Sequence, residues 1–176
     1  MKKLALVVMA IAVGAVGFGV RAGEKVTIDK LPKAVTNAVK KRFPRAEMKD
    51  GSKDTADGKT TYEVSIKEAG KGIDVSLTAD GVITLIEKEL AFKDLPKKVA
   101  DTFTAKYPGA TYKIVEEVIK VKDGKEATDY FEAIVVAADK TEYEAEVAPD
   151  GKFLKETKKE PPKPEPKGGK VPEKKG

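Results

Sequence analysis

Two segments of the chain share one pattern of apolar residues. The apolar positions recur at every fourth residue: Leu31, Val35, Val39 and Phe43 in the first segment and, 64 positions later, Leu95, Val99, Phe103 and Tyr107 in the second. Pro32 and Pro96 fit the first turn of a helix, where the missing N–H needs no partner. Pro44 and Pro108 then end it. The spacing therefore predicts two short amphipathic helices whose apolar faces belong to a core.

After each helix, apolar and polar residues alternate, which is typical of strands with one buried face. The side chains expected to point inward are Tyr62, Val64, Ile66, Ile73, Val75 and Leu77 in the first copy and Phe131, Ala133, Val135, Tyr143, Ala145 and Val147 in the second. Asp-Gly pairs favour tight hairpin turns because glycine adopts positive φ. Such pairs begin at Asp50, Asp57, Asp80, Asp123 and Asp150. Each copy is therefore expected to hold one helix followed by about four antiparallel strands.

These elements predict an α+β protein of two tandem helix-plus-antiparallel-sheet repeats, in the order α-β-β-β-β. The repeats span residues 27–90 and 91–156. A repeat of this size buries little core by itself, so we expect two sheets joined side by side with both helices packed on one face. Residues 157–176, rich in Lys, Pro, Glu and Gly, predict a disordered tail.

Residues 1–22 have the features of a secretory signal peptide. Lys2 and Lys3 precede an apolar run from Leu4 to Val20, and small residues favour cleavage before Gly23. The alternative is an uncleaved membrane anchor, although the run is shorter than the roughly 20 apolar residues that span a bilayer. We expect a periplasmic or secreted protein with no membrane insertion after cleavage. The chain has no cysteine, which excludes disulfides and thiolate chemistry.

The formal charge of +5 belongs to the ends of the chain. The leader carries three positive charges and residues 157–176 a net +4, which leaves −2 for residues 23–156. No basic groove of the kind that follows phosphates is evident, so nucleic acid is not expected as a partner. The tail is either a solubilising extension or a weak contact for anionic polymers.

The residue types argue against catalysis. Histidine and cysteine are both absent, and with them the usual general base and nucleophile. Glu116 and Glu117 are neighbours on an expected strand, so they point to opposite faces and cannot act as a pair. The segment DGSKDTADG, residues 50–58, lacks the alternate spacing and closing glutamate of a calcium loop, and a polar turn is expected there. We predict no enzyme, no cofactor and no metal site.

One strand is apolar on both faces. Tyr130, Ile134 and Val136 lie opposite the inward set, where the first copy has Ser65 and Lys67. Either the same chain covers this second face, through the other repeat, a loop or the linker Leu90–Phe92, or the face is an open patch that docks a partner.

A row of glutamates lies on the outward face of the following strand. Glu142, Glu144 and Glu146 alternate with inward apolar residues, and Glu132 joins them at the rim of the patch. An outward row of this kind is either a solvated face or a contact for a cation or a basic partner.

The whole pattern resembles the PepSY-like domain family, which is similar to the bacterial β-lactamase inhibitor protein. The residues that carry the resemblance are Leu-Pro at 31–32 and 95–96, Phe-Pro at 43–44, Tyr-Pro at 107–108, Tyr62-Glu63, Phe131-Glu132 and the Asp-Gly pairs. The resemblance extends from about Thr27 to Glu156 and implies a secreted, non-catalytic protein that binds or inhibits another envelope protein. The inhibitor looks disulfide-supported and uses an aromatic-rich concave sheet, whereas this chain lacks Cys and Trp. The inhibitor's contacts therefore do not map onto this sequence.

Two functions fit these features. The first is a secreted or periplasmic protein-binding module, in one form an inhibitor of an envelope hydrolase, that acts through the open sheet face. The candidate partner-binding residues are Tyr130, Glu132, Ile134, Val136, Glu142, Glu144 and Glu146. For an open patch, Ile134→Lys is expected to abolish binding with little loss of stability. The alternative is an envelope structural or ion-buffering protein that contacts charged polymers through its Glu row and basic tail.

Overall fold

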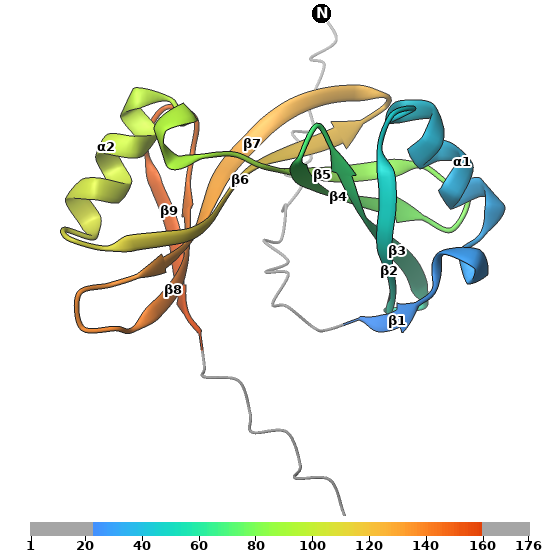
Figure 1. Ribbon diagram of the computed structural model, residues 1–176, viewed down its shortest axis with the longest axis horizontal. Coiled ribbons are helices and arrows are strands. Elements are labelled where there is room, and N and C mark those ends of the chain that lie inside the picture. Colours follow the sequence, from blue (N-terminus) through green and yellow to red (C-terminus); the bar gives the residue numbers. More distant parts are fainter. Residues whose placement is uncertain (1–22, 160–176) are drawn as a thin grey trace, which may run out of the picture.

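The computed structural model describes residues 23–159, which form one antiparallel sheet and two α-helices (Figure 1). The strands are β1 (Glu24–Val26), β2 (Glu47–Ala56), β3 (Lys59–Glu68), β4 (Lys71–Thr78), β5 (Ile83–Glu89), β6 (Thr111–Lys122), β7 (Lys125–Val136), β8 (Glu142–Val147) and β9 (Phe153–Lys158). The helices are α1 (Lys33–Arg42) and α2 (Lys97–Lys106), preceded by the 3₁₀ turns η1 (Ile28–Lys30) and η2 (Phe92–Asp94). The expected signal peptide lies outside the described residues.

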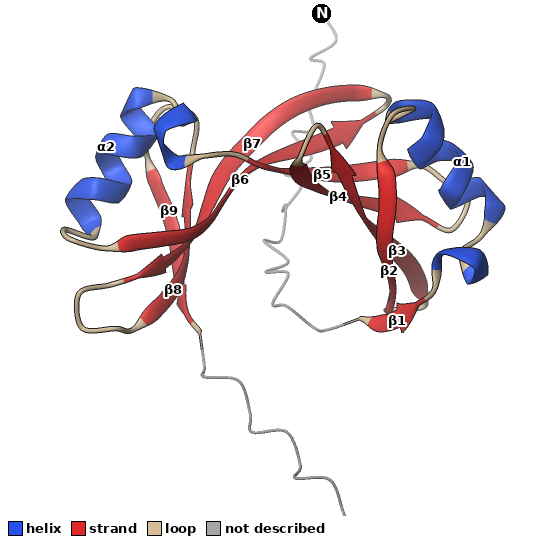
Figure 2. Cartoon of the chain, viewed as in Figure 1, coloured by secondary structure: helices blue, strands red, loops and turns tan. Residues whose placement is uncertain are grey.

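Every strand pairs with the next strand in the chain, so the order of the sheet is β1 to β9 (Figure 2). The α+β class is confirmed, and four strands follow each helix. The strands of the two repeats are joined side by side into one continuous sheet, because β5 pairs with β6 from Leu85 opposite Lys120 to Glu89 opposite Glu116. Thr157 and Lys158, expected in the tail, are the last two residues of β9. Neither described helix is long and apolar enough to cross a membrane.

The two apolar stripes form two cores on the same side of the sheet. All eight stripe residues are buried. Val35 and Val39 pack with the inward residues of β3 and β4, and Val99 and Phe103 pack with those of β7 and β8. Full burial of such a side chain stabilises the fold by about 1.5–3 kcal/mol. The stripes therefore hold both helices on one face of the sheet.

The repeats share their cores and are not independent. Ile119 of β6 belongs to the core under α1, although it comes from the second repeat. Arg42, the last residue of α1, donates two hydrogen bonds to the Glu126 carboxylate of β7, at 2.7 and 3.0 Å. Both side chains are about one third exposed, at 39% and 34%, so this pair fixes geometry more than it stabilises the fold.

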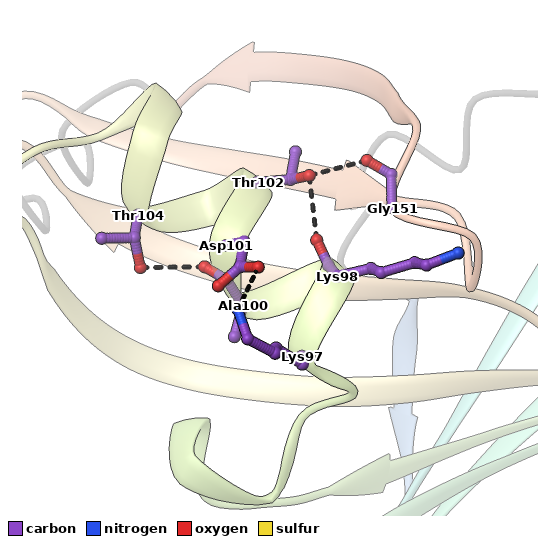
Figure 3. A network of polar contacts seen from close by, with 7 residues as sticks. All are labelled: Lys97, Lys98, Ala100, Asp101, Thr102, Thr104 and Gly151. Atoms are coloured by element: carbon purple, nitrogen blue, oxygen red, sulfur yellow. Dashed lines mark hydrogen bonds and ion pairs between the residues drawn. The ribbon is translucent and has the colours of Figure 1, made fainter.

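Each helix touches a hairpin turn through a glycine. The Thr102 hydroxyl of α2 donates a hydrogen bond to the Gly151 carbonyl oxygen in the turn between β8 and β9 (Figure 3), and the two oxygens are 2.7 Å apart. Gly151 has φ 91°, and a Cβ there would lie 2.9 Å from Lys98 Cβ. Gly81 stands in the same relation to α1: its φ is 86°, and a Cβ would lie 2.6 Å from the Ala34 carbonyl oxygen. Two of the Asp-Gly pairs thus serve both turn geometry and helix packing.

Four of the five Asp-Gly pairs lie at hairpin turns, as predicted. The hairpin turn predicted at Asp50-Gly51 is wrong. Asp50 and Gly51 lie inside β2, next to a register shift between Met48 and Asp50. A Cβ on Gly51 would come within 2.8 Å of the Val26 carbonyl oxygen. This glycine permits close approach of a neighbouring backbone, and it does not form a turn.

Substitution of the helix-contacting glycines tests this packing. Gly81→Ala and Gly151→Ala are expected to destabilise the protein, first through positive φ, at about 1–2 kcal/mol, and further through the clash with the helix, at about 1–3 kcal/mol. Gly109→Ala is the matched control, because Gly109 has φ 73° and open space around its Cβ position. Urea unfolding measures the difference. Equal losses at all three positions would show that the helices do not rest on these turns.

Candidate functional site

One face of the sheet is turned away from both helices, and we call it the inner face. The sheet arches between two lobes, with α1 and α2 on the outer side of the arch (Figure 1). Within residues 23–159, no helix packs on the inner face. The linker does not cover it either, because Leu90 and Phe92 pack in the core under α2, where the Phe92 ring stacks on Tyr112 at 4.0 Å. Of the alternatives given for this face, cover by the linker is therefore excluded.

Four glutamates lie directly opposite one another on neighbouring strands of the inner face. This glutamate ladder consists of Glu89 on β5, Glu116 on β6, Glu132 on β7 and Glu146 on β8. Like charges in directly opposite positions destabilise a sheet, because their Cβ atoms are only about 4.5–5.5 Å apart. The ladder therefore costs folding stability, and folding alone gives no reason for it.

More carboxylates flank the ladder on the same face. Asp74 of β4 lies opposite Glu87 of β5, and Glu144 of β8 lies opposite Ile134. Ligand oxygens of Glu132, Glu144 and Glu146 all lie within 4.8 Å of one another. The inner face from β4 to β8 is thus a strongly acidic surface.

The cations that meet these carboxylates come from the C-terminal strand. Lys155 Nζ lies 3.4 Å from Glu146 Oε1, and Lys159 Nζ lies 3.0 Å from Glu144 Oε2. Among the described residues, no lysine or arginine forms an ion pair with Glu87, Glu116 or Glu132. The carboxyl groups at the centre of the face therefore have no cation paired with them in the described part of the chain.

Burial makes these central carboxylates unusual acids. Loss of solvent, followed by repulsion from neighbouring carboxylates, raises the pKa of Glu132 to about 8. The same causes raise the pKa of Glu87 and that of Glu116 to about 7. Glu144 and Glu146 are only 12% and 18% exposed in their side chains. The interpretation of the Glu row as a solvated face is wrong at these two positions.

Apolar side chains lie between the carboxylates. Ile114 of β6 lies opposite Ile134, and Val118 lies opposite Tyr130. Ile114 is 44% exposed, whereas Ile134 is 9% exposed and Val118 is fully buried. Ile134 therefore forms the floor of the patch, and Ile134→Lys would cost stability, contrary to expectation. Ile114 is the residue that a partner can touch.

The seven candidate residues all lie on the inner face, from Tyr130 to Val136 on β7 and from Glu142 to Glu146 on β8. Sequence reasoning missed Glu87, Glu89 and Glu116, which β5 and β6 bring beside them. Glu117, in contrast, lies on the other face and accepts a hydrogen bond from Thr128 at 2.5 Å, so the two adjacent glutamates do not pair, as expected.

The acidic cluster suits ammonium groups better than a closed metal cage. Calcium takes six to eight oxygens, whereas Glu132, Glu144 and Glu146 offer three carboxylates. Two of these already contact lysine. In the segment of residues 50–58, Asp50 and Asp54 lie along β2 and Asp57 lies in the turn after it, so they do not converge as a calcium loop does.

The raised pKa values predict that stability falls as pH rises. A carboxyl whose pKa is higher in the folded state keeps its proton there while the unfolded chain, with pKa near 4.5, has lost it. The unfolding free energy should therefore decrease from about pH 5 to pH 8.5, on the order of 1 kcal/mol per group after solvent screening. Thermal unfolding of the wild type and Glu132→Gln measures this, and the variant should show the shallower slope.

Glu126→Gln is the control for this measurement. Arg42 lowers the pKa of Glu126, so its stabilisation is present at neutral pH and is lost only in acid. Glu126→Gln should have a smaller unfolding free energy than the wild type at pH 7. Its unfolding free energy should still decrease towards pH 8.5, as that of the wild type does. A wild type that is equally stable at pH 5.5 and 8.5 would contradict the burial of the ladder.

Known structures share the fold of this chain. A BLIP-like protein from Bacteroides fragilis has 20% identity and a TM-score of 0.55, with 72% of this chain and 86% of that chain covered. A protein from Bacteroides eggerthii, named a "putative periplasmic" protein, has 18% identity and a TM-score of 0.60, with 72% and 88% covered. A DUF2874 family protein from Bacteroides uniformis has 18% identity and a TM-score of 0.59, with the same coverage.

A comparison with curated proteins finds no match. A family model described as "Putative beta-lactamase-inhibitor-like, PepSY-like" matches the chain twice, at residues 20–87 and 82–154. The two matches correspond to the two helix-and-strand repeats and together include the whole inner face from β2 to β8. The chain belongs to this PepSY-like family.

Proposed function

We propose that the protein is a non-catalytic binding module of the cell envelope that captures a basic segment of another protein on its inner face. The observation that carries the proposal is the glutamate ladder, which lies on a face that no described helix covers and holds central carboxylates without cations. Mutual repulsion of these groups costs free energy in the unbound protein. A partner that supplies lysine or arginine side chains removes this cost.

The ion pairs at the edge of the face support this proposal, because they are contacts that such a partner would repeat. Lys159 reaches Glu144, whose side chain is 12% exposed, and Lys155 reaches Glu146. Charge-assisted hydrogen bonds in half-buried positions are shorter and stronger than neutral ones. Equivalent contacts from a partner to Glu116 and Glu132 would continue the same pattern across β7 and β6.

Apolar contact completes the binding surface. Ile114 is exposed, Val136 is half-buried near it, and Tyr130 is half-buried further along β7, opposite Val118. Complementary charge speeds association and selects partners, while buried apolar side chains supply most of the affinity. The preferred ligand is therefore a basic segment with an apolar or aromatic side chain between its cations.

The family and the leader support an envelope location and a binding role. The matching family is described as β-lactamase-inhibitor-like, and one protein of similar fold is named periplasmic. We propose that the target is an envelope hydrolase or another secreted protein, which the module inhibits when the bound segment borders an active site. The chain contains no histidine or cysteine, which favours binding over catalysis.

A structural or ion-buffering role in the envelope is the second candidate. The convergence of Glu132, Glu144 and Glu146 within 4.8 Å favours it, since such a cluster attracts mobile cations. In this role the basic tail would contact anionic polymers. Binding of that kind weakens steeply with salt and does not depend on Ile114.

Capture from an envelope extract tests the leading proposal. The baits are residues 23–176 as wild type, as Glu116→Gln/Glu132→Gln on the inner face, and as Glu117→Gln on the opposite face. The wild type and Glu117→Gln should retain one defined protein, identified by mass spectrometry. The double variant should bind it at least tenfold more weakly, which corresponds to about 1.4 kcal/mol. Equal retention by all three baits would contradict a role for the ladder.

Ile114→Ser separates the two candidate functions. The substitution removes exposed apolar surface without changing charge, so it should weaken capture of a protein partner about threefold to tenfold, by about 1 kcal/mol. If the protein is instead an ion buffer, Ile114→Ser should leave its cation binding unchanged. Isothermal titration with the captured partner and with calcium chloride makes the comparison, and calcium binding at full strength together with no partner binding would favour the second candidate.

A further inference from the structure

The last strand delivers the C-terminus of the chain to the inner face. Along β9, Lys155 lies opposite Glu146 and Thr157 lies opposite Glu144, so alternate residues face the carboxylates. Lys159, the last described residue, continues this alternation: its backbone N–H donates to the Glu142 carbonyl oxygen at 2.9 Å. Its ammonium group lies 3.0 Å from Glu144 Oε2. The chain therefore leaves the structure while still in contact with the acidic surface.

The residues that follow have the complementary charge. Residues 160–176 contain five lysines and three glutamates, and the lysines are Lys163, Lys167, Lys170, Lys174 and Lys175. Glu87, Glu116 and Glu132 form no ion pair with any described residue, and they lie on β5, β6 and β7, the three strands next to β8. A basic segment that could pair with these groups is thus present in the same chain.

The length of this segment matches the distance that it has to cross. Strands are about 4.8 Å apart and advance about 3.3 Å per residue. Glu132 lies two strands from β9 and is level with Lys155, four residues before Lys159, so it is about 16 Å from Lys159. Glu87 lies four strands from β9 and further along the sheet, about 28 Å from Lys159. An extended proline-rich chain advances about 3.1 Å per residue. Counted from Lys159, the backbone can then carry Lys167 about 25 Å and Lys170 about 34 Å, so Lys167 can reach Glu132 and Lys170 can reach Glu87.

We propose that residues 160–176 bind the inner face of their own chain, with Lys163, Lys167 and Lys170 against the carboxylates of β5 to β7. Tethering gives the segment an effective concentration in the millimolar range, so even weak ion pairs would occupy the face for much of the time. A basic partner must displace the segment before it binds. This competition rests on the proposed function, but the intramolecular contact itself does not.

Paramagnetic relaxation locates the segment directly. The chain has no cysteine, so Gly168→Cys in the mature chain, residues 23–176, carries a single nitroxide label. The proposal expects broadening of amide signals at Glu116 and Glu132, with recovery in about 0.5 M salt, where the Debye length falls to a few ångström. Absence of this broadening, or broadening confined to amides of β9, would overturn the proposal.

A mixture of spin-labelled chains and unlabelled, isotope-enriched chains tests contact between two copies. If the enriched chains in the mixture show broadening of equal size, contact within one chain is overturned.

Two matched charge variants complete the experiment. Lys163→Gln/Lys167→Gln/Lys170→Gln should abolish the broadening, whereas Lys33→Gln/Lys40→Gln/Lys41→Gln, which removes three exposed charges from the region of α1, should leave it unchanged. Equal effects of both variants would overturn the proposal. If a partner is captured, the tail variant should bind it several times more tightly than wild type. Broadening without any captured partner refutes only the proposed function, and a captured partner without broadening refutes only the tail contact.

Discussion

The pairing of β5 with β6 joins the two repeats into one sheet. Without it, each repeat would present its own small inner face, and Glu89 would not lie opposite Glu116. The pairing also carries Ile119 of the second repeat into the core under α1. A single set of backbone hydrogen bonds thus completes a hydrophobic core on one side of the sheet and brings the carboxylates of both repeats together on the other.

The two faces of the sheet are governed by different forces. On the outer side, the apolar stripes of α1 and α2 remove large side chains from water and stabilise the fold. On the inner side, partly buried carboxylates face one another across β5 to β8, and their repulsion opposes the same fold. Proteins retain arrangements that lower their stability chiefly where a binding or catalytic role requires them. The contrast between the faces therefore supports a functional interpretation of the inner one.

The sequence predicts local features well because they depend on neighbouring residues. Helix stripes such as Leu31 to Phe43, the alternation around Val64 and Ala133, and the turns at Asp57 and Asp123 all follow from short-range patterns, and the structure confirms them. Asp50-Gly51 was misassigned because the same dipeptide also suits a strand position where another backbone approaches closely. The burial of Ile134 and the ladder depend on register between strands distant in the sequence, which alternation alone does not determine. The seven candidate residues were found on one face, but Glu87, Glu89 and Glu116 could not be added to them without the pairing of β5 with β6.

The most direct test of a buried, partly protonated glutamate ladder is a site-resolved titration of side-chain carboxyl carbons by NMR, in about 0.5 M salt to screen the charges of the chain ends. The structure predicts that Glu132 titrates with a pKa well above the ordinary value of 4.5, near 8, and that Glu116 and Glu87 titrate near 7. Titration of all three carboxyls between pH 4 and 5 would show that the inner face is an ordinary solvated surface and would contradict the account.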